Sequence, residues 1–292
     1  LFSECNLRLS KLIDLGNKMD LNEVDALSYL VFDPQTRVIG MHLESIAGDP
    51  GAFVSLVRQA IASGKRVVVL KSGRTEEGAK AAASHTGAMV KGSDAIFDTA
   101  IKQCGALRAN TIEEFFDLAR ALERFGSLSL TGNRIAVVAM SGGEGVILTD
   151  LVQQEGMQMA QVTPATMARL KDIFPPWEIG ANPFDLGISL QFNDAIKVYK
   201  TLIPALSEDE NIDVLHVQIP DRAINLPREN FAVFNDVPAL HKPIVLWSVI
   251  AKPGSHETLQ WLEDHQVPVF SSPEKALRAV VALRRVSAQA PV

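Results

Sequence analysis

The chain contains the stretch Arg66-Val-Val-Val-Leu-Lys-Ser-Gly-Arg-Thr-Glu-Glu-Gly-Ala-Lys-Ala-Ala-Ala-Ser-His-Thr-Gly87, in which an apolar run gives way to small and polar residues. Residues 66–70 are typical of a buried strand, and helical periodicity starts again near Ser93. The residues between them predict a loop far longer than the usual connection of about 2–6 residues. Because long loops in compact domains are commonly functional, this loop is a candidate site.

His85, near the far end of this stretch, is a candidate carrier of a phosphoryl group, with Gly78 and Gly87 as candidate pivots. A neutral imidazole attacks phosphorus well, and the pKa of histidine allows the neutral form near pH 7. A partner must hold the other ring nitrogen as N–H, and Glu44 is the candidate because it ends an apolar strand. The alternatives are a solvated or structural histidine and an ordinary surface glutamate.

Short apolar runs alternate with segments of helical periodicity along the whole chain. Such alternation indicates parallel sheets that are covered by helices on both faces. Strands are expected near residues 7–15, 37–43, 66–70, 106–108, 135–140, 214–219, 244–249 and 267–270. Helices are expected from a cap at Asp20 or Asn22 to Asp33, and near residues 51–63, 93–103, 112–125, 146–155, 164–173, 193–203, 256–265 and 273–285.

The turn-forming run from Gly126 to Asn133 divides this pattern into two. It predicts two consecutive flavodoxin-like, doubly wound α/β domains, residues 1–129 and 130–292, and a chain of 292 residues fits two domains. Ligands of doubly wound sheets bind beyond the carboxyl ends of the strands. Glu44, the His85 segment and the glycine-rich residues after the strand 135–140 are all expected at such ends.

Those glycine-rich residues are Ser141-Gly-Gly-Glu-Gly145, predicted as a tight loop before a helix that starts at Val146. A strand, glycines and a helix N-terminus bring backbone N–H groups and a positive dipole end to one place, which suits phosphate. The stretch is neither a Walker A loop nor a hydrolase nucleophile elbow. It predicts phosphate binding by Ser141, Gly142, Gly143 and Gly145, with a merely tight turn as the alternative.

Composition excludes several classes of function. A net charge of −6 and a pI near 5.6 argue against a nucleic-acid binder, and no apolar run is long enough to cross a membrane. The sequence has no secretory signal, and Cys5 and Cys104 lack metal-type spacing, so reduced thiols in a cytoplasmic protein are expected. His216 lies in an apolar strand and is predicted to be a core histidine. Asn182-Pro-Phe-Asp185 is either a functional loop or a turn.

Taken together, these motifs resemble the phosphohistidine region of NDP-forming acyl-CoA synthetases, which are relatives of succinyl-CoA synthetase. The resemblance covers nearly the whole chain, and Ser-His-Thr-Gly is its most specific part. Besides Glu44 and residues 141–145, the matching motifs are Lys71-Ser-Gly-Arg74, Gly78 to Gly87, Gly92-Ser-Asp94, Gln103-Cys-Gly105, Gly16-Asn-Lys-Met-Asp20 and Asn182-Pro-Phe-Asp185.

The resemblance implies conversion of acyl-CoA, phosphate and NDP into free acid, CoA and NTP. His85 would match the histidine that takes phosphate from an acyl phosphate, and Glu44 the glutamate that hydrogen-bonds the phosphohistidine. Ser141, Gly142, Gly143 and Gly145 would match the start of a helix that holds the phosphate. CoA, ADP/ATP or GDP/GTP, and Mg²⁺ are expected in the full assembly, with no cofactor bound wholly by this chain and no metal site in it.

This sequence departs from the family in two respects. It begins at Leu1 and contains neither the CoA-binding Rossmann domain nor the ATP-grasp domain, so we expect a fragment that needs these partners, as fused domains or subunits of an oligomer, and is inactive alone. Glu144 stands where a small residue or proline is expected, which puts a negative charge near the predicted phosphate. The side chain would weaken the site unless it points away.

Three other functions remain open from the sequence. The first is a regulatory, acyl-CoA- or nucleotide-sensing module of the kind fused to protein acetyltransferases, although a sensor has no use for a phosphate carrier. The second is a plain flavodoxin-like binding module, which would never carry acid-labile phosphate. The third is a phosphatase, for which the sequence offers no Asp-x-Asp motif, metal cluster or basic clamp.

Overall fold

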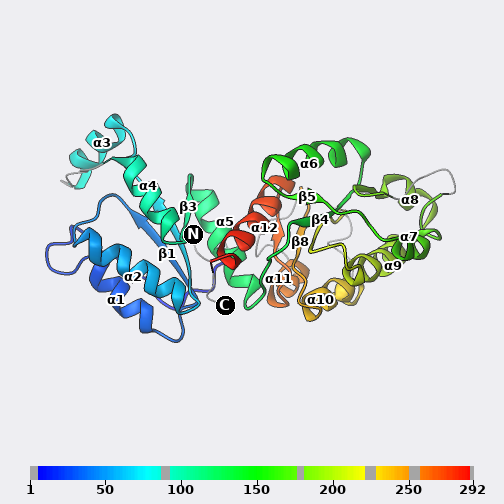
Figure 1. Cartoon of the computed structure of the whole chain (residues 1–292), viewed down its shortest axis with the longest axis horizontal. Helices are drawn as coiled ribbons and strands as arrows, with labels where there is room; N and C mark the ends of the chain where they lie inside the picture. The colour runs from blue at the N-terminus through cyan, green and yellow to red at the C-terminus, as the bar shows by residue number, and fades with distance from the viewer. Residues whose placement is uncertain (1–5, 87–92, 176–180, 221–227, 250–256, 290–292) are drawn as a thin grey trace. The chain divides into compact units, whose positions relative to one another are not determined.

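The computed structural model describes residues 6–86, 93–175, 181–220, 228–249 and 257–289 (Figure 1). The chain divides into two compact units, which we call the N-terminal unit (residues 7–123) and the C-terminal unit (residues 124–287). The division falls inside a helix, just before the predicted linker at 126–133. Each unit is described by itself.

The N-terminal unit contains a parallel three-stranded sheet in the order β1-β2-β3. Its strands are β1 (Val38–Leu43), β2 (Arg66–Lys71) and β3 (Leu107–Ala109). Its helices are α1 (Glu23–Phe32), α2 (Pro50–Ala62), α3 (Glu76–Thr86), α4 (Asp94–Gln103) and α5 (Ile112–Phe125), the last of which runs across the unit boundary.

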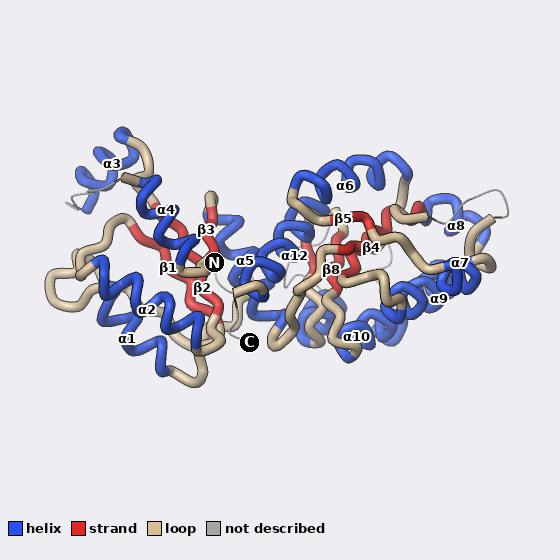
Figure 2. Tube along the Cα trace, viewed as in Figure 1, coloured by secondary structure: helices blue, strands red, loops and turns tan. Residues whose placement is uncertain are grey.

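Helices cover both faces of this sheet, as Figure 2 allows the reader to follow. On one face, apolar side chains of α1, α2 and α4 pack against Ile39, Met41, Val67 and Val69. On the other face α5 approaches closely, because a Cβ at Gly40 would lie 3.0 Å from the ring of Phe115. Buried and exposed positions alternate along β1, so Gly40 and His42 on its second face stay open to solvent, whereas β2 is buried on both faces.

The C-terminal unit has a parallel sheet in the order β5-β4-β7-β8-β9, with β6 paired to the end of β4. This is the flavodoxin-like order, in which the first strand lies between the second and the third. The strands are β4 (Arg134–Ala139), β5 (Gln158–Met159), β6 (Phe184–Asp185), β7 (Val214–Gln218), β8 (Ile244–Trp247) and β9 (Val269–Phe270).

The core of this unit lies between the sheet and α9, α10 and α11, while α6 and α12 contact the strands as well. His216, in β7, is fully buried beside Trp247 and shares a hydrogen bond of 3.0 Å between Nε2 and the carbonyl oxygen of Pro273, so the prediction of a core histidine is confirmed. It is only partly satisfied, because Nδ1 has no hydrogen-bond partner among the described residues. The helices are α6 (Gly142–Gln154), α7 (Pro164–Leu170), α8 (Leu186–Phe192), α9 (Ala195–Glu208), α10 (Ala232–Ala239), α11 (Glu257–Asp264) and α12 (Pro273–Ser287), and a 3₁₀ turn spans Arg228–Phe231.

The fold class is confirmed: both sheets are parallel and are covered by helices. The strand predicted at residues 7–15 is wrong. No strand of the described chain pairs with this segment, and its apolar side chains, such as Leu12 at 68% exposure, remain in solvent.

The long loop predicted between Lys71 and Gly87 is also wrong, because α3 occupies most of it. Four alanines, the strongest helix formers, stand at positions 79 and 81–83, and Glu76 and Glu77 favour the positive end of the helix dipole. Gly87, one of the predicted pivots, lies outside the described residues, and Gly78 lies in the first turn of α3.

Candidate functional site

In the C-terminal unit, the connections from β4 diverge: β5 lies on one side of it and β7 on the other. Such a topological switch point opens a crevice beyond the carboxyl ends of the two strands, where open α/β sheets bind ligands. β4 is followed there by Met140 and Ser141, and β7 ends at Gln218. The flavodoxin-like order therefore places the predicted glycine stretch at the expected ligand position of the sheet.

The glycine stretch is itself helical, so the predicted loop and helix start at Val146 are wrong by one turn. Ser141 is the N-cap of α6, and its hydroxyl oxygen accepts a hydrogen bond of 3.3 Å from the backbone N–H of Glu144. Ser141, Gly142 and Gly143 are exposed and Gly145 is buried. The unpaired N–H groups of a first helical turn thus lie at the surface of the switch point.

Two of the three glycines allow close packing and the third faces open space. A Cβ at Gly145 would lie 3.0 Å from Pro183, and one at Gly142 would lie 3.3 Å from the carboxylate of Asp185. A Cβ at Gly143 would meet nothing within 4 Å. Gly145 is therefore required for packing, whereas Gly143 leaves the backbone N–H groups accessible.

Glu144 does not point away from this helix start. Its carboxylate accepts hydrogen bonds from the Ser141 hydroxyl at 3.2 Å and from the side-chain amide of Gln218 at 3.3 Å. The sequence indicates the extra negative charge but not the orientation of the side chain. The carboxylate is held beside the N-terminus of α6, on the side of β7.

Gln218 was not identified from the sequence, although a polar residue at the end of an otherwise apolar strand is a usable signal. Its side-chain oxygen accepts the backbone N–H of Met140 at 2.6 Å, and its carbonyl oxygen accepts the hydroxyl of Tyr199 at 2.7 Å. Burial raises the pKa of Tyr199 far above its ordinary value, so the phenol stays a donor. Gln218 thus fixes the two strand ends on both sides of the switch point.

The stretch Asn182–Asp185 stabilises the backbone around the switch point. The Asn182 amide accepts the backbone N–H of Val137 at 2.9 Å and donates to the carbonyl oxygens of Ile135 and Ala160 at 2.8 and 3.1 Å. Asp185 accepts the backbone N–H of Gly187 at 2.8 Å and so caps α8. These contacts account for both polar residues without a ligand.

In the N-terminal unit, Glu44 follows β1 and is half-buried. The residues after it are tied to α1: Glu23 accepts the backbone N–H groups of Ala47 and Gly48 at 2.6 and 2.9 Å, and Lys18 donates to the carbonyl oxygen of Ser45 at 2.7 Å. Burial opposes ionisation of Glu23, yet these backbone hydrogen bonds and Lys18 lower its pKa. The backbone beside Glu44 is therefore firmly held.

His85 lies in the last turn of α3, and its side chain is outside the described part of the structure. Thr75 precedes the helix, and its hydroxyl oxygen accepts a hydrogen bond of 3.1 Å from the backbone N–H of Gly78 in the first turn. Glu44 and His85 belong to the N-terminal unit and residues 141–145 to the C-terminal unit, so their approach to one another stays a prediction.

Two findings concern other classes of site. Among the described residues, no three His, Cys, Asp or Glu side chains are grouped as metal ligands would be. The helices of the described ranges are also all too short or too polar to cross a membrane.

Comparison with known proteins finds relatives that match nearly the whole chain. The family model of the succinyl-CoA ligase-like flavodoxin domain matches residues 2–122. The 4-hydroxybutyrate–CoA ligase (ADP-forming) of Nitrosopumilus maritimus is 34% identical over 280 residues, which cover 95% of this chain and 39% of that protein. The alpha subunit of acetate–CoA ligase (ADP-forming) II of Pyrococcus furiosus is 32% identical over 283 residues, covering 95% of this chain and 60% of the subunit. The chain is a homologue of part of an ADP-forming acyl-CoA ligase.

The structure supports this assignment. An acetyl-coenzyme A synthetase from Ca. Korarchaeum cryptofilum, solved with phosphate and ADP, matches 97% of this chain and 60% of its own, with a TM-score of 0.80 and 30% identity. The resemblance to NDP-forming acyl-CoA synthetases is thereby confirmed. The chain spans about 40–60% of the length of the relatives it matches.

Proposed function

We propose that this chain supplies the phosphohistidine and one phosphate-binding helix start of an NDP-forming acyl-CoA synthetase, an acid–thiol ligase. The observation that carries the proposal is the homology over 95% of the chain to ADP-forming acyl-CoA ligases. The flavodoxin-like switch point at Ser141 supports it, because an exposed helix N-terminus at that place suits an anion.

The proposed chemistry divides one difficult reaction into steps. Phosphorolysis of acyl-CoA gives an acyl phosphate and CoA. A ring nitrogen of His85 then attacks phosphorus: a nitrogen–phosphorus bond forms, the bond from phosphorus to the acyl oxygen breaks, and the free carboxylate leaves. Attack by NDP on the phosphohistidine breaks the nitrogen–phosphorus bond and gives NTP. The names of the relatives favour ADP and ATP over GDP and GTP.

Residues of this chain would have distinct roles in these steps. Glu44 would accept the N–H of the second ring nitrogen of His85 and stabilise the phosphorylated imidazole. Ser141, Gly142 and Gly143 would present backbone N–H groups to the phosphate oxygens. Gly145 would act through packing, because it is buried and its N–H already donates to the carbonyl oxygen of Ser141 at 3.1 Å. CoA and the nucleotide with its Mg²⁺ would be bound by CoA-binding Rossmann and ATP-grasp domains or subunits, in a cytoplasmic oligomer.

The proposal predicts a separation of the partial reactions in the complete synthetase. His85→Asn should still form acyl phosphate from acyl-CoA and phosphate, because His85 acts only afterwards, but should form no NTP. Trapping of acyl phosphate with hydroxylamine and measurement of NTP would follow the two steps. Glu44→Gln should slow NTP formation by roughly 10²–10⁴-fold.

His265→Asn is the matched control, because His265 is exposed and hydrogen-bonds the carbonyl oxygen of Trp261 in α11. This variant should retain both activities. NTP formation by the His85→Asn enzyme would remove the mechanism. Absence of both partial reactions in the folded wild-type synthetase would favour a binding or sensing module.

A further inference from the structure

The segment that carries His85 leaves the sheet after β2 and returns at α4. β2 ends at Lys71, α3 spans Glu76–Thr86, and α4 begins at Asp94. None of the α3 side chains that the structure describes is buried. Because most helices in proteins are stabilised by a buried apolar face, the direction of α3 depends on how the chain is held at the two ends of this excursion.

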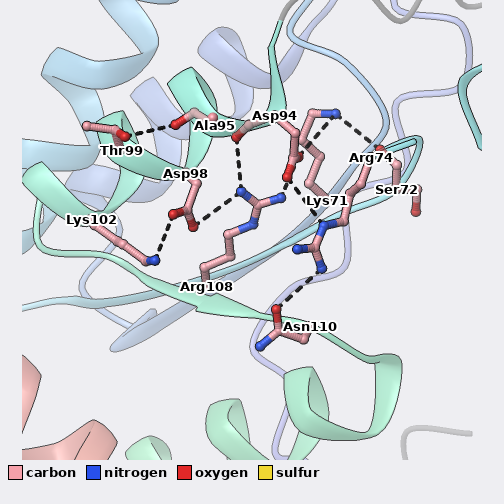
Figure 3. Close-up of polar contacts among 10 residues, drawn as sticks. All are labelled: Lys71, Ser72, Arg74, Asp94, Ala95, Asp98, Thr99, Lys102, Arg108 and Asn110. Carbon is pink, nitrogen blue, oxygen red and sulfur yellow. Dashed lines mark hydrogen bonds and ion pairs between the residues drawn. The ribbon is translucent and has the colours of Figure 1, made fainter. Parts of the chain in front are cut away.

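Asp94 is the point at which those two ends meet (Figure 3). Its carboxylate accepts a hydrogen bond of 3.4 Å from Arg74 Nε, and Arg74 lies in the connection between β2 and α3. The ammonium group of Lys71, at the end of β2, lies 4.0 Å from the same carboxylate. Asp94 itself is the first residue of α4. One carboxylate therefore joins the departing chain to the returning chain.

Arg108, in β3, ties this carboxylate to the sheet. Its Nη2 donates to Asp94 Oδ1 at 2.6 Å, and its Nη1 donates to the backbone carbonyl oxygen of Asp94 at 3.3 Å. Arg74 also donates to the side-chain oxygen of Asn110, just beyond β3, at 3.3 Å. Both ends of the excursion are thus fastened to the carboxyl end of one strand.

Burial and charge strengthen above all the contact between Arg108 and Asp94. The side-chain exposure is 3% for Arg108, 8% for Lys71 and 26% for Asp94, and partly buried ion pairs are screened less by salt than exposed ones. Burial opposes ionisation of Asp94, but the hydrogen bond from Arg108 and the charges of Arg108, Arg74 and Lys71 lower its pKa below the ordinary value. The carboxylate therefore stays ionised wherever an imidazole is neutral.

We propose that Asp94 is a positioning residue for His85: through Arg74, Lys71 and Arg108 it fixes the base of the α3 excursion. Because these contacts fix the start of α3 relative to the sheet, the helix holds His85 at a constant distance from that point. The catalytic consequence rests on the proposed function, whereas the fixed base can be tested without any turnover.

Hydrogen–deuterium exchange of the α3 backbone amides in the full-length protein tests whether Asp94 holds the start of α3 in place. Asp98→Asn is the matched control for Asp94→Asn, because Asp98 lies one turn further along α4 and pairs with Lys102 at 2.7 Å and Arg108 at 3.3 Å. We expect exchange in α3 to be at least about tenfold faster in Asp94→Asn and to change less than about twofold in Asp98→Asn. Equal exchange in the two variants would overturn the proposal.

Arg74→Gln provides a second variant, since Arg74 is 40% exposed and Asp94 also favours the start of α4 through the helix dipole. It should reproduce the faster exchange in α3 while α4 stays protected. If exchange in α3 is unchanged in this variant, the fixed base is refuted even where Asp94→Asn is poorly folded.

Phosphoryl transfer in the complete synthetase tests the positioning role. Asp94→Asn and Arg74→Gln should lower kcat for NTP formation by about 10–100-fold and change KM for the acyl phosphate by less than about threefold, with partial recovery in Asp94→Glu. If exchange in α3 is faster in these variants but kcat is unchanged, the positioning role of Asp94 fails while the proposed function stands. If His85→Asn also retains NTP formation, the proposed function itself fails.

Discussion

At the start of α6, the carboxylate of Glu144 lies beside the helix N-terminus that we propose to bind phosphate. The Ser141 hydroxyl and the Gln218 amide hold it there at 3.2 and 3.3 Å. A negative charge in the first turn is favourable for an empty helix N-terminus, but it repels an anion that binds to the same N–H groups. In the proposed site, Glu144 would therefore compete with phosphate.

Replacing Glu144 with Gln should therefore tighten phosphate binding about 2–5-fold, the equivalent of the roughly 0.3–1 kcal/mol that a charge contributes at a helix end. The measurement is the phosphate concentration that half-saturates acyl phosphate formation by the complete synthetase. Asp150→Asn, an exposed position in the same helix, controls for the change in net charge. Weaker phosphate binding in Glu144→Gln would mean that the carboxylate helps to hold the ligand.

His216 gives the stability of the C-terminal unit a dependence on pH. Burial lowers the pKa of this imidazole from 6.5 to about 4, against the opposing effect of the Pro273 carbonyl oxygen. Between those values the unfolded chain binds a proton that the native chain does not, so stability falls as the pH falls from 6.5 to 4. The loss reaches about 3 kcal/mol at the lower end.

Urea denaturation at pH 4.5 and pH 7 would measure this loss. In His216→Gln, which cannot take up a proton, the difference in stability between the two pH values should be smaller than in the wild type by about 2–3 kcal/mol. His265→Asn, an exposed position, should leave the difference unchanged. If His216→Gln and the wild type show the same difference in stability, the native chain binds a proton at His216 as readily as the unfolded chain does.

At the scale of elements, Arg124, near the end of α5, and Glu263, in α11, form a buried ion pair within the C-terminal unit. Arg124 Nε lies 3.4 Å from Glu263, and both side chains are almost fully buried. Arg124 also donates to the carbonyl oxygen of Asn6 at 2.8 Å, and the Asn6 amide donates to Glu263. Neither charge has access to water, so each depends on the other.

Removal of one member of this ion pair should lower the stability of the protein considerably. Glu263→Gln should lower the free energy of unfolding by about 3–5 kcal/mol, because it removes a buried negative charge from beside the buried Arg124 guanidinium. Glu208→Gln, which breaks the exposed pair with Arg169, should cost less than about 1 kcal/mol. Denaturant titration of both variants checks the contrast, and equal costs would mean that water reaches the buried pair.

The elements that the sequence predicts well are those with a buried apolar face. α1, α2, α4 and α5 and the core of β1 and β2 follow directly from hydrophobic periodicity. α3 was missed because its alanines give no such period, although their helix propensity was a usable signal. Residues 7–15 were wrongly predicted as a strand, because periodicity does not tell whether a partner strand exists.

The candidate site was predicted in the same uneven way. The glycine stretch at 141–145 is recognisable because its residue types match the needs of a helix N-terminus. The roles of Gln218 and Asp94 depend on contacts with residues far along the chain, Glu144 in one case and Arg74 and Arg108 in the other. Such contacts exist only once the sheets have formed, so local sequence cannot reveal them.

At the scale of the whole molecule, the two units divide the proposed chemistry between them. Glu44 and His85 belong to the N-terminal unit, and the glycine helix start belongs to the C-terminal unit. The chain spans about 40–60% of the length of its relatives, and the proposal assigns the remaining functions to partner domains or subunits. Everything in this division depends on His85 being phosphorylated.

The most direct test is to locate the phosphoryl group. The complete synthetase would be incubated with labelled ATP and Mg²⁺, digested with trypsin without acid, and analysed by mass spectrometry. Lys80 and Lys91 flank a peptide, residues 81–91, in which His85 is the only histidine. The account predicts an acid-labile phosphate on this peptide that is absent in His85→Asn. Label on another peptide, or label that survives acid, would contradict it.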